Sequence, residues 1–415
     1  RLSLRERLLF AERKATIGAL PRVGWTSLAI AMLLSIPSMP TFAAELTDRN
    51  VNLRGSLNNC RIQFETDKSG HVAFMGGSIT EMNGYRPLVC HWLQKRFPET
   101  KFTFTDAGIS STCSTTGAMR LQRDVLSQGP VDLFLVEFAV NDDQDAAHAR
   151  RDCIRGMEGI VAQIRRHNPK ADIVIVYFCN PGMVAKFQAG DVPVSVAAHE
   201  AVAEHHGVST VNLAKEVAQQ ITAEQLTWKQ FGGTHPGPAG NRLAADMAAL
   251  LLEKSWKQEG KQAPHETPEK LLDENSYTSG RLLSFDGVEF DDAWKLEAPD
   301  WKSLPGNCRP RFLMENLLHA DKPGAELTLK FTGRAIGAYV LAGPDAGAVE
   351  TSIDGGDFHS TGLYHRFSTG LHYPRTVMFH TDLTDGEHTL RLRVHRATDA
   401  RSRGHAVRVL GCTAH

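Results

Sequence analysis

Residues 71–256 alternate short apolar runs with amphipathic stretches, and this alternation restricts the fold more than any other feature of the chain. The run 131–138 is apolar at most positions, as in strands that are buried on both faces of a parallel sheet. In the stretch 149–167 the apolar residues instead recur at helical spacing and form one face. Strands that alternate with helices are joined by right-handed crossovers. The region is therefore predicted to fold as a three-layer α/β/α sandwich with a parallel sheet.

The boundaries of these elements follow from the same pattern. The predicted strands are His71–Met75, Lys101–Thr105, Val131–Phe138, Asp172–Phe178 and Val208–Asn212. The predicted helices are Pro87–Phe97, Thr116–Leu126, Ala149–His167, Ser195–His206 and Ala239–Trp256. Ligands of open α/β sheets bind beyond the carboxyl ends of the strands, so the residues that follow each strand are the first to search for chemistry.

A second region with a different periodicity follows. The segment 257–280 is polar and contains prolines, and we interpret it as a linker. In 325–331 apolar residues alternate with polar neighbours, and turn residues such as Asp385-Gly386 separate stretches of this kind. Residues 281–415 are therefore predicted to form an antiparallel, all-β sandwich domain.

The N-terminal segment has the features of a targeting signal. Basic residues precede the apolar run Trp25–Ile36, which is shorter than the roughly 20 residues that a membrane-spanning helix needs. Small residues follow it, so we interpret 1–44 as a signal peptide cleaved near Ala44, and 45–70 as a lead-in to the α/β domain. Export without stable membrane insertion is the expected outcome. The alternative is an amphipathic or anchoring helix that stays attached.

Composition excludes several kinds of function. Lys and Arg number 46 against 47 Asp and Glu, so no basic excess exists for binding nucleic acid. The expected partner is a small molecule or a polysaccharide, and no pattern indicates an oligomeric state. The seven cysteines include no Cys-x-x-Cys spacing, and their odd number leaves at least one unpaired even in an oxidising compartment.

Residues suited to acyl transfer occur at four places in the α/β region. Ser78 follows the first strand in a glycine-rich turn that can expose its hydroxyl. Gly108 follows the second strand, where it can present its backbone N–H. Asn141 closes the most apolar strand and can donate its side-chain amide to an oxyanion. His235 lies between glycines and prolines that hold it on a rigid loop before the last helix.

In residue type, chain order and position at strand ends, these four places resemble the motifs of the Ser-Gly-Asn-His (SGNH) hydrolases, also called the GDSL esterase family. The matching segments are Gly76-Gly77-Ser78, Asp106-Ala107-Gly108, Ala139-Val140-Asn141-Asp142 and Gly233-Thr234-His235-Pro236. The resemblance covers 71–256 and implies a flavodoxin-like sheet and esterase or acetylesterase activity without a cofactor. It also implies Ser78 as nucleophile, His235 as base, and an oxyanion hole made by the N–H groups of Ser78 and Gly108 with the Asn141 amide.

The chain departs from the family pattern at two glycines. Gly77 stands where the family usually has Asp before the serine, and Gly232 stands where it usually has the Asp that orients the histidine. Three explanations are open for the second departure. A backbone carbonyl holds His235 in a Ser-His dyad, another carboxylate (Glu137 or Asp142) substitutes, or the enzyme is impaired and binds ligand only. We favour the dyad.

Glu137 lies in an otherwise apolar run and needs a partner if it is buried and ionised. By topology the nearest candidate is Arg86, shortly after the nucleophile. Arg86 either forms a structural ion pair that braces the loops or grips an anionic group on the substrate, and we favour the former.

The sequence predicts no metal site and no cofactor. The run His199–His205 resembles a zinc-peptidase helix, but that motif needs a second histidine at position 203, where Ala203 stands. No Gly-Lys-Ser/Thr phosphate-binding motif follows a strand either.

The β region resembles the jelly-roll modules that accompany carbohydrate esterases, through segments such as 349–356 and 383–390. Such a domain either binds carbohydrate or packs without a ligand of its own. Together with export, it favours hydrolysis of short acyl esters, above all acetyl esters on a polysaccharide. The alternatives are a lipase or thioesterase of the same fold, and a catalytically impaired glycan-binding protein.

Overall fold

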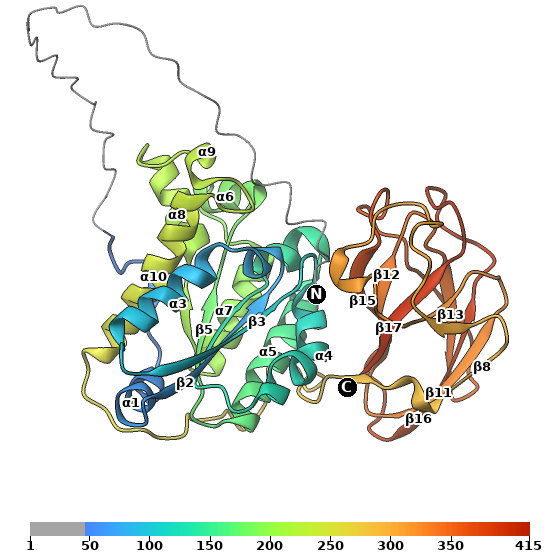
Figure 1. Cartoon of the computed structure of the whole chain (residues 1–415), viewed down its shortest axis with the longest axis horizontal. Helices are drawn as coiled ribbons and strands as arrows, with labels where there is room; N and C mark the ends of the chain where they lie inside the picture. Colours follow the sequence, from blue (N-terminus) through green and yellow to red (C-terminus); the bar gives the residue numbers. More distant parts are fainter. Residues whose placement is uncertain (1–45) are drawn as a thin grey trace, which may run out of the picture. The chain divides into compact units, whose positions relative to one another are not determined.

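The structure is a computed structural model that describes residues 46–415, so the predicted signal peptide 1–44 lies outside the described residues. The described chain contains a parallel α/β domain followed by two antiparallel β-sheets (Figure 1). This confirms the predicted fold class, and it shows that the change of periodicity near residue 281 marks a change of architecture.

A six-stranded sheet forms the centre of the α/β domain, in the order β1-β6-β5-β4-β2-β3. Its strands are β1 (Val51–Asn52), β2 (Ser69–Gly76), β3 (Lys101–Gly108), β4 (Leu133–Glu137), β5 (Asp172–Val176) and β6 (Ser209–Val211). Strands β2 to β6 pair in parallel, whereas β1 is antiparallel to β6. Taken in chain order, the five parallel strands have the flavodoxin-like arrangement.

Helices lie on both faces of this sheet, with α3 and α10 on one side and α4 and α5 on the other (Figure 1). The helices are α1 (Asn58–Thr66), α2 (Ser78–Glu81), α3 (Tyr85–Arg96), α4 (Ser114–Asp124), α5 (Arg150–His167), α6 (Pro181–Gln188), α7 (Val194–His205), α8 (Leu213–Thr222), α9 (Trp228–Phe231) and α10 (Pro238–Trp256). Short turns of other helix types occur at η1 (Leu126–Gln128) and η2 (Asn141–Asp145), of which η2 is a π-helix. The segment 45–70 contributes β1 and α1 to the domain.

Burial explains why the central strands read as continuous apolar runs. Every residue of β4 and of β5 is buried, because helices cover both faces of the sheet. The segment 257–280 contains no regular helix or strand and is held against the α/β domain. His265 lies 2.8 Å from Asp172, and the Ser276 hydroxyl donates a 2.6 Å hydrogen bond to Glu158.

The β domain is a sandwich of two antiparallel sheets, ordered β15-β12-β17-β10-β9 (with β7 on β17) and β14-β13-β16-β11-β8. Its strands are β7 (Arg281–Leu283), β8 (Val288–Phe290), β9 (Lys295–Glu297), β10 (Leu317–Ala320), β11 (Glu326–Thr332), β12 (Ile336–Ala342), β13 (Ala348–Ile353), β14 (His359–Gly362), β15 (Tyr373–His380), β16 (Glu387–Val394) and β17 (Val407–Ala414). Short 3₁₀ turns lie at η3 (Phe285–Gly287) and η4 (Pro310–Phe312). In β11 the apolar residues are buried while their neighbours are more exposed, which is the period of two seen in the sequence.

Two further findings concern the whole described chain. All seven cysteines are free. Within residues 46–415, no helix combines the length and the apolar character that crossing a membrane requires.

Candidate active site

The candidate residues gather where the order of the strands reverses, between β2 and β4. Gly76 at the end of β2 pairs with Glu137 on one side and with Gly108 on the other. In flavodoxin-like sheets this reversal opens a crevice beyond the strand ends, and ligands bind there. Ser78 and Asn141 follow β2 and β4, so the topology brings them to the same crevice.

The turn that carries Ser78 is held by a buried carboxyl group. Glu137 Oε1 accepts hydrogen bonds from the Gly77 N–H and from the Thr80 hydroxyl, each at 2.9 Å. A Cβ on Gly77 would overlap the side-chain amide of Asn141. The family's usual Asp does not fit at position 77, because Asn141 occupies the space that its side chain would need.

Ser78 and His235 are in direct contact. Ser78 Oγ lies 2.7 Å from His235 Nε2, although the two residues are 157 positions apart in the chain. Ser78 is half-buried and His235 is exposed. Ser78 is also the first residue of α2, so its own N–H is among those that have no partner within the helix.

The loop before His235 leaves no room for a side chain at position 232. Helix α9 ends at Gly232, which has the left-handed φ of 103°. The loop then closes back on itself, and the Gly237 N–H donates to the Phe231 carbonyl at 2.9 Å. A Cβ on Gly232 would overlap the backbone nitrogen of Gly237. The carboxylate that the family usually has at this position is therefore excluded by the loop's own backbone.

Neither of the two substitute carboxylates considered above contacts His235. Glu137 binds the nucleophile turn, and Asp142 accepts from the Ser114 N–H and hydroxyl and contacts His199 Nε2 at 2.9 Å. Within residues 46–415, His235 Nδ1 has no hydrogen bond to a carboxylate or to a carbonyl. The backbone carbonyl expected to hold the imidazole is therefore not found, and the described residues form a Ser-His pair whose base has no second partner.

Gly108 lies directly against the nucleophile helix. A Cβ there would overlap the backbone of Glu81 in α2, so only glycine permits this approach. The Gly108 N–H, which the resemblance assigns to the oxyanion hole, donates to Asp106 Oδ1 at 3.0 Å. Its carbonyl accepts from Arg311 of the β domain at 2.9 Å. The predicted donor is therefore already hydrogen-bonded in this structure.

Asn141 begins the π-helix η2, a helix type that is frequent at functional sites. Asn141 Nδ2 donates to Asp145 Oδ2 at 2.5 Å. A carboxylate only accepts hydrogen bonds, so this contact orients the amide with its nitrogen toward Asp145 and its oxygen toward Gly77. One N–H of the amide is fixed in this way, and the second N–H is left for another acceptor.

Arg86 does not pair with Glu137, so the expected ion pair is wrong. Arg86 lies 2.7 Å from Asp106 Oδ2 and donates from Nε to the Thr80 carbonyl at 3.2 Å. It joins α3 to the end of β3 and to α2. Glu137 has no cationic partner among the described residues, and burial raises its pKa to about 8, so the neutral acid is favoured.

Two further residues, Arg120 and Asp145, hold the site and were not predicted from the sequence. Arg120 on α4 is fully buried and donates to the carbonyls of Gly76 and Ala107, at 3.1 and 2.8 Å, at the ends of β2 and β3. In the predicted helix Arg120 lies on the side of Thr116 and Asp124, away from the apolar residues, so the pattern carries no sign of this role. Asp145 lies in an acidic run whose composition gives no sign that it holds Asn141.

Three groups of potential metal ligands occur within the described residues, each with its ligand atoms within 4.8 Å of one another. They are Cys113, Asp142 and His148; Asp142, Cys153 and His199; and Glu158, His205 and His206. Contacts within the protein account for much of this clustering. His199 contacts Asp142 at 2.9 Å, and His206 contacts Glu158 at 3.0 Å.

The raised pKa of Glu137 has a consequence for stability. The group ionises near pH 4.5 when unfolded and near pH 8 when folded. Between these values the folded chain keeps a proton that the unfolded chain has released. The free energy of unfolding therefore falls with rising pH, by up to about 1.4 kcal/mol per pH unit from this group. Glu137→Gln should flatten this fall in denaturant unfolding measured from pH 5 to pH 8.

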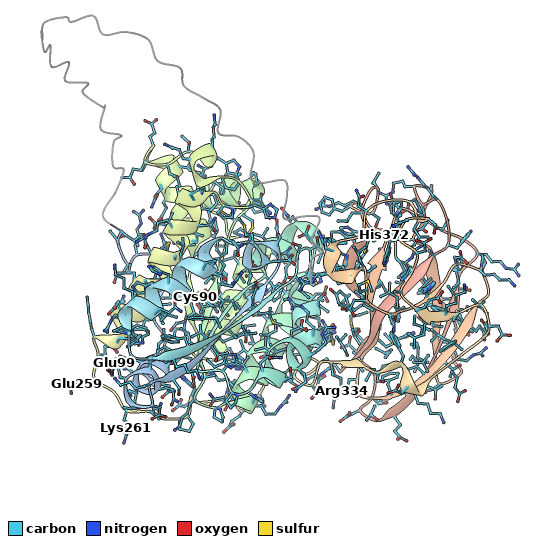
Figure 2. All side chains as sticks on the ribbon, in the orientation of Figure 1. Cys90, Glu99, Glu259, Lys261, Arg334 and His372 are labelled. Atoms are coloured by element: carbon cyan, nitrogen blue, oxygen red, sulfur yellow. The ribbon has the colours of Figure 1, made fainter. Side chains whose placement is uncertain are left out.

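The control is Glu99→Gln, which removes an exposed carboxylate, labelled in Figure 2, that pairs with Lys68. This variant should lose stability with pH as steeply as the parent. Glu137→Gln buries an amide nitrogen that needs a hydrogen-bond acceptor, and this lowers stability at every pH. The comparison therefore uses the slope of the unfolding free energy against pH and not its absolute value. Equal slopes in Glu137→Gln and the parent would contradict the assignment.

Comparison with known proteins adds to this geometry. Residues 74–243 match the model of the GDSL-like lipase/acylhydrolase family. The chain is also similar to two crystal structures of a two-domain esterase (CEX) active on acetylated mannans, one of them co-crystallized with mannopentaose. The TM-scores are 0.71 without mannopentaose and 0.70 with it, at 18% and 20% identity, and the matches cover 89% and 88% of this chain and 98% and 96% of theirs. No curated protein sequence matches the chain.

At this identity the structural likeness concerns the fold, whereas the family model matches the sequence itself. Its matched range includes Ser78, Gly108, Asn141 and His235. The α/β domain thus belongs to the GDSL-like lipase/acylhydrolase family, and the protein is an ester hydrolase.

Proposed function

We propose that this enzyme removes short acyl groups, above all acetyl, from a polysaccharide by a Ser-His acyl-enzyme mechanism. The observation that carries the proposal is the 2.7 Å contact between Ser78 Oγ and His235 Nε2 at the strand-order reversal. The substrate class is supported by the two-domain esterase active on acetylated mannans, whose fold matches over 88% of this chain.

In the first step, His235 Nε2 takes the proton of the Ser78 hydroxyl while Oγ attacks the ester carbonyl. The negative charge that develops on the carbonyl oxygen is held by the Ser78 N–H and by the free N–H of Asn141. The Gly108 N–H joins them when Asp106 releases it. His235 then protonates the leaving sugar hydroxyl, and water attacks the acyl-enzyme by the same route to release the carboxylic acid.

The base acts without a carboxylate partner in this proposal. His235 is exposed, so solvent can hydrogen-bond its Nδ1. The rigid loop that excludes a side chain at Gly232 also limits where the imidazole can move, which partly replaces the orienting role of the missing carboxylate. A modest turnover is the expected cost of a dyad.

We further propose that the enzyme acts outside the cytoplasm, with 1–44 as its signal peptide. A polysaccharide outside the cell does not cross a membrane unaided, so an esterase reaches it only after export. The β domain supports the same substrate class, because jelly-roll-like modules accompany carbohydrate esterases.

The first test concerns the nucleophile. Ser78→Ala should lower kcat for acetyl ester hydrolysis by at least about 1,000-fold, and a fluorophosphonate probe should label Ser78 in the parent only. Ser110→Ala, which alters a nearby serine that binds Glu81, should still be labelled. Retained activity in Ser78→Ala would reject the mechanism.

The substrate is tested by comparing p-nitrophenyl acetate with long-chain p-nitrophenyl esters, and by measuring acetate released from acetylated mannan. Faster hydrolysis of the acetyl ester and release of acetate support the proposal. A preference for long acyl chains would indicate a lipase or thioesterase. Binding of glycan without hydrolysis would indicate an impaired enzyme.

A further test concerns Asp145, which orients the Asn141 amide. Asp145→Ala should lower kcat by about 10- to 100-fold with little change in KM, because an oxyanion donor acts mainly in the transition state. Asp145→Asn keeps an acceptor oxygen and should recover most of the activity. Asp143→Ala, on the same π-helix but bonded to Asn180, is the control and should leave kcat unchanged. A rise in KM alone would reject this role.

The last test concerns the carboxylate that is missing at position 232. Gly232→Asp should fail to raise kcat and should lower the free energy of unfolding by at least about 2 kcal/mol, because the side chain meets a left-handed backbone and the Gly237 nitrogen. At Gly233 φ is 97° but a Cβ meets nothing within 4 Å, so Gly233→Ala should cost less. A stable, faster Gly232→Asp variant would refute this account of the loop.

A further inference from the structure

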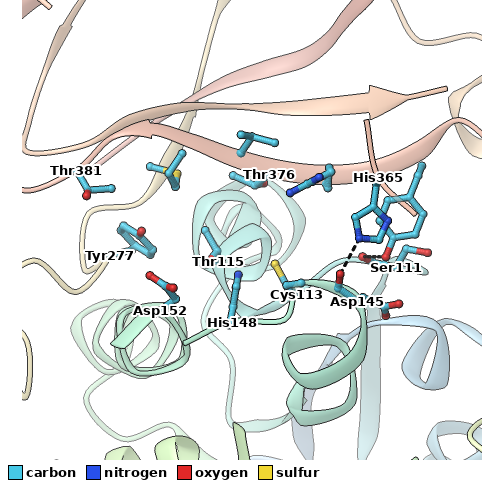
Figure 3. Close-up of a pocket in the computed structure, with 15 residues that line it drawn as sticks. Ser111, Cys113, Thr115, Asp145, His148, Asp152, Tyr277, His365, Thr376 and Thr381 are labelled. Atoms are coloured by element: carbon cyan, nitrogen blue, oxygen red, sulfur yellow. Dashed lines mark hydrogen bonds between the residues drawn. The ribbon is translucent and has the colours of Figure 1, made fainter. Parts of the chain in front are cut away.

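A cavity of about 330 Å³ lies beside the active site, with residues of both domains on its walls (Figure 3). Cys113 lines it and is only 5% exposed. Its Sγ has one long contact, 3.6 Å to the Thr116 hydroxyl. Cys113 is also the N-cap residue of α4, where the helix dipole favours a thiolate, and its side chain makes no capping hydrogen bond there. The proposed ester hydrolysis uses neither the Cys113 thiol nor its place at the start of α4.

His148 lies next to this thiol on the same wall of the cavity (Figure 3). The ligand-type atoms of Cys113, His148 and Asp142 all fall within 4.8 Å of one another. His148 Nδ1 is buried without a hydrogen bond to another described residue, and it lies 3.6 Å from Asp142 Oδ1. Asp142 is itself fully buried and held by Ser114 and His199. The three side chains thus form one compact cluster, in which the imidazole favours a thiolate on Cys113 while the nearby Asp142 carboxylate opposes it.

Electrostatics favour the charged pair. Burial alone would raise the pKa of the Cys113 thiol, but the adjacent His148 outweighs it and holds the pKa below its usual value. Burial alone would likewise lower the pKa of His148, but Cys113 and Asp142 hold it well above its usual value. The thiolate and the imidazolium therefore stabilise each other.

The other charged groups of the cavity come from three elements. Arg375 on β15 forms no ion pair or hydrogen bond with another described residue. Among the anionic groups near it, Cys113 contributes most to favouring the charged form of Arg375. Asp145 on η2 and Asp152 on α5 bring carboxyl groups to the same cavity. Burial raises the pKa of Asp145 and so weakens its opposition to a thiolate.

The remaining titratable side chains of the cavity are neutral near pH 7. Burial lowers the pKa of His365 to about 4 and raises the pKa of Tyr277 to about 12. Burial also raises the pKa of Tyr373 above its usual value. The cations that face Cys113 at neutral pH are therefore His148 and Arg375.

We propose that Cys113, His148 and Asp142 form a second reactive site, a thiolate–imidazolium pair that takes small disulfides and other soft electrophiles through this cavity. In the reaction, the Cys113 thiolate attacks one sulfur of a disulfide and forms a mixed disulfide. The other sulfur leaves as a thiolate, which His148 can protonate. The incoming disulfide is the oxidant, so no further reactant is needed.

A group on Cys113 would also affect ester hydrolysis. It would occupy the cavity that Asp145 lines, and Asp145 orients Asn141. Modification of Cys113 is therefore expected to lower kcat by about the same factor as Asp145→Ala. This consequence rests on the proposed function, whereas the reactivity of Cys113 does not.

The decisive experiment compares Cys113 with two more exposed cysteines of the same chain. Cys90, labelled on α3 in Figure 2, and Cys308 are both half-exposed, and burial raises their pKa values to about 12 and about 11. With iodoacetamide at pH 6, mapped by mass spectrometry, Cys113 should be alkylated at least about 10 times faster than either, despite its lower exposure. With 2-hydroxyethyl disulfide, Cys113 should form a mixed disulfide that dithiothreitol reverses.

His148→Gln removes the cation and should lower the rate at Cys113 to that of Cys90. His365→Gln is the matched control, because it alters the same cavity without removing a charge, and it should leave Cys113 fast. Equal rates for the three cysteines, or no effect of His148→Gln, would overturn the proposal. Labelling that requires prior treatment with a chelator would also overturn it, since the three residues would then bind a metal.

The two parts of the inference are separated by their readouts. Alkylation is measured by mass alone, so it tests the thiol site even if the ester substrate has been assigned wrongly. The second readout is the rate of acetyl ester hydrolysis by enzyme alkylated at Cys113, in which the fluorophosphonate probe still reaches Ser78. If this enzyme is as fast as the unmodified enzyme, the proposed effect of Cys113 on catalysis is rejected.

Discussion

The active site depends on the buried carboxyl of Glu137, which joins the end of β4 to the turn that follows β2. Its Oε1 accepts from the Gly77 N–H and the Thr80 hydroxyl, and so fixes the backbone on both sides of Ser78. Burial favours the uncharged acid, so this junction is held by hydrogen bonds without an ion pair. A neutral acid in the floor of the site also adds no negative charge where an oxyanion must develop. The same group that braces the nucleophile therefore leaves the electrostatics of acyl transfer undisturbed.

Close backbone approach is the second constraint, and it accounts for the departures from the family pattern. Gly77 has no side chain because the Asn141 amide lies in that space, and Gly232 has none because the loop closes on Gly237. The first glycine lets the Asn141 side chain pack against the nucleophile turn, with its amide oxygen toward Gly77. The second removes the carboxylate that usually orients the base. Both substitutions are consequences of packing, and the second explains why a site with the family's Ser and His contact has only a dyad among its described residues.

The β domain is part of this arrangement. Arg309 donates to the Ser110 carbonyl and the Ser111 hydroxyl, and Arg311 donates to the Gly108 carbonyl and contacts Glu81 of the nucleophile helix. These arginines hold the loop after β3 from the side of the second domain. The cavity that Cys113 lines is formed between the same two domains, so a change there can reach the loops that carry the proposed oxyanion donors.

The kinds of elements, their order and the four motif positions could be predicted from the sequence, because apolar periodicity and glycine-rich turns are local properties. The prediction missed β1, α1, α2, α6, α8 and α9, of which β1, α2 and α9 are too short for a periodic pattern to identify. Which charged groups meet could not be predicted in this way and is seen in the folded chain alone. Arg86 pairs with Asp106 instead of Glu137, and Arg311 reaches Gly108 across 203 positions. Such contacts depend on strand register and domain packing, which bring together segments whose sequences carry no record of each other.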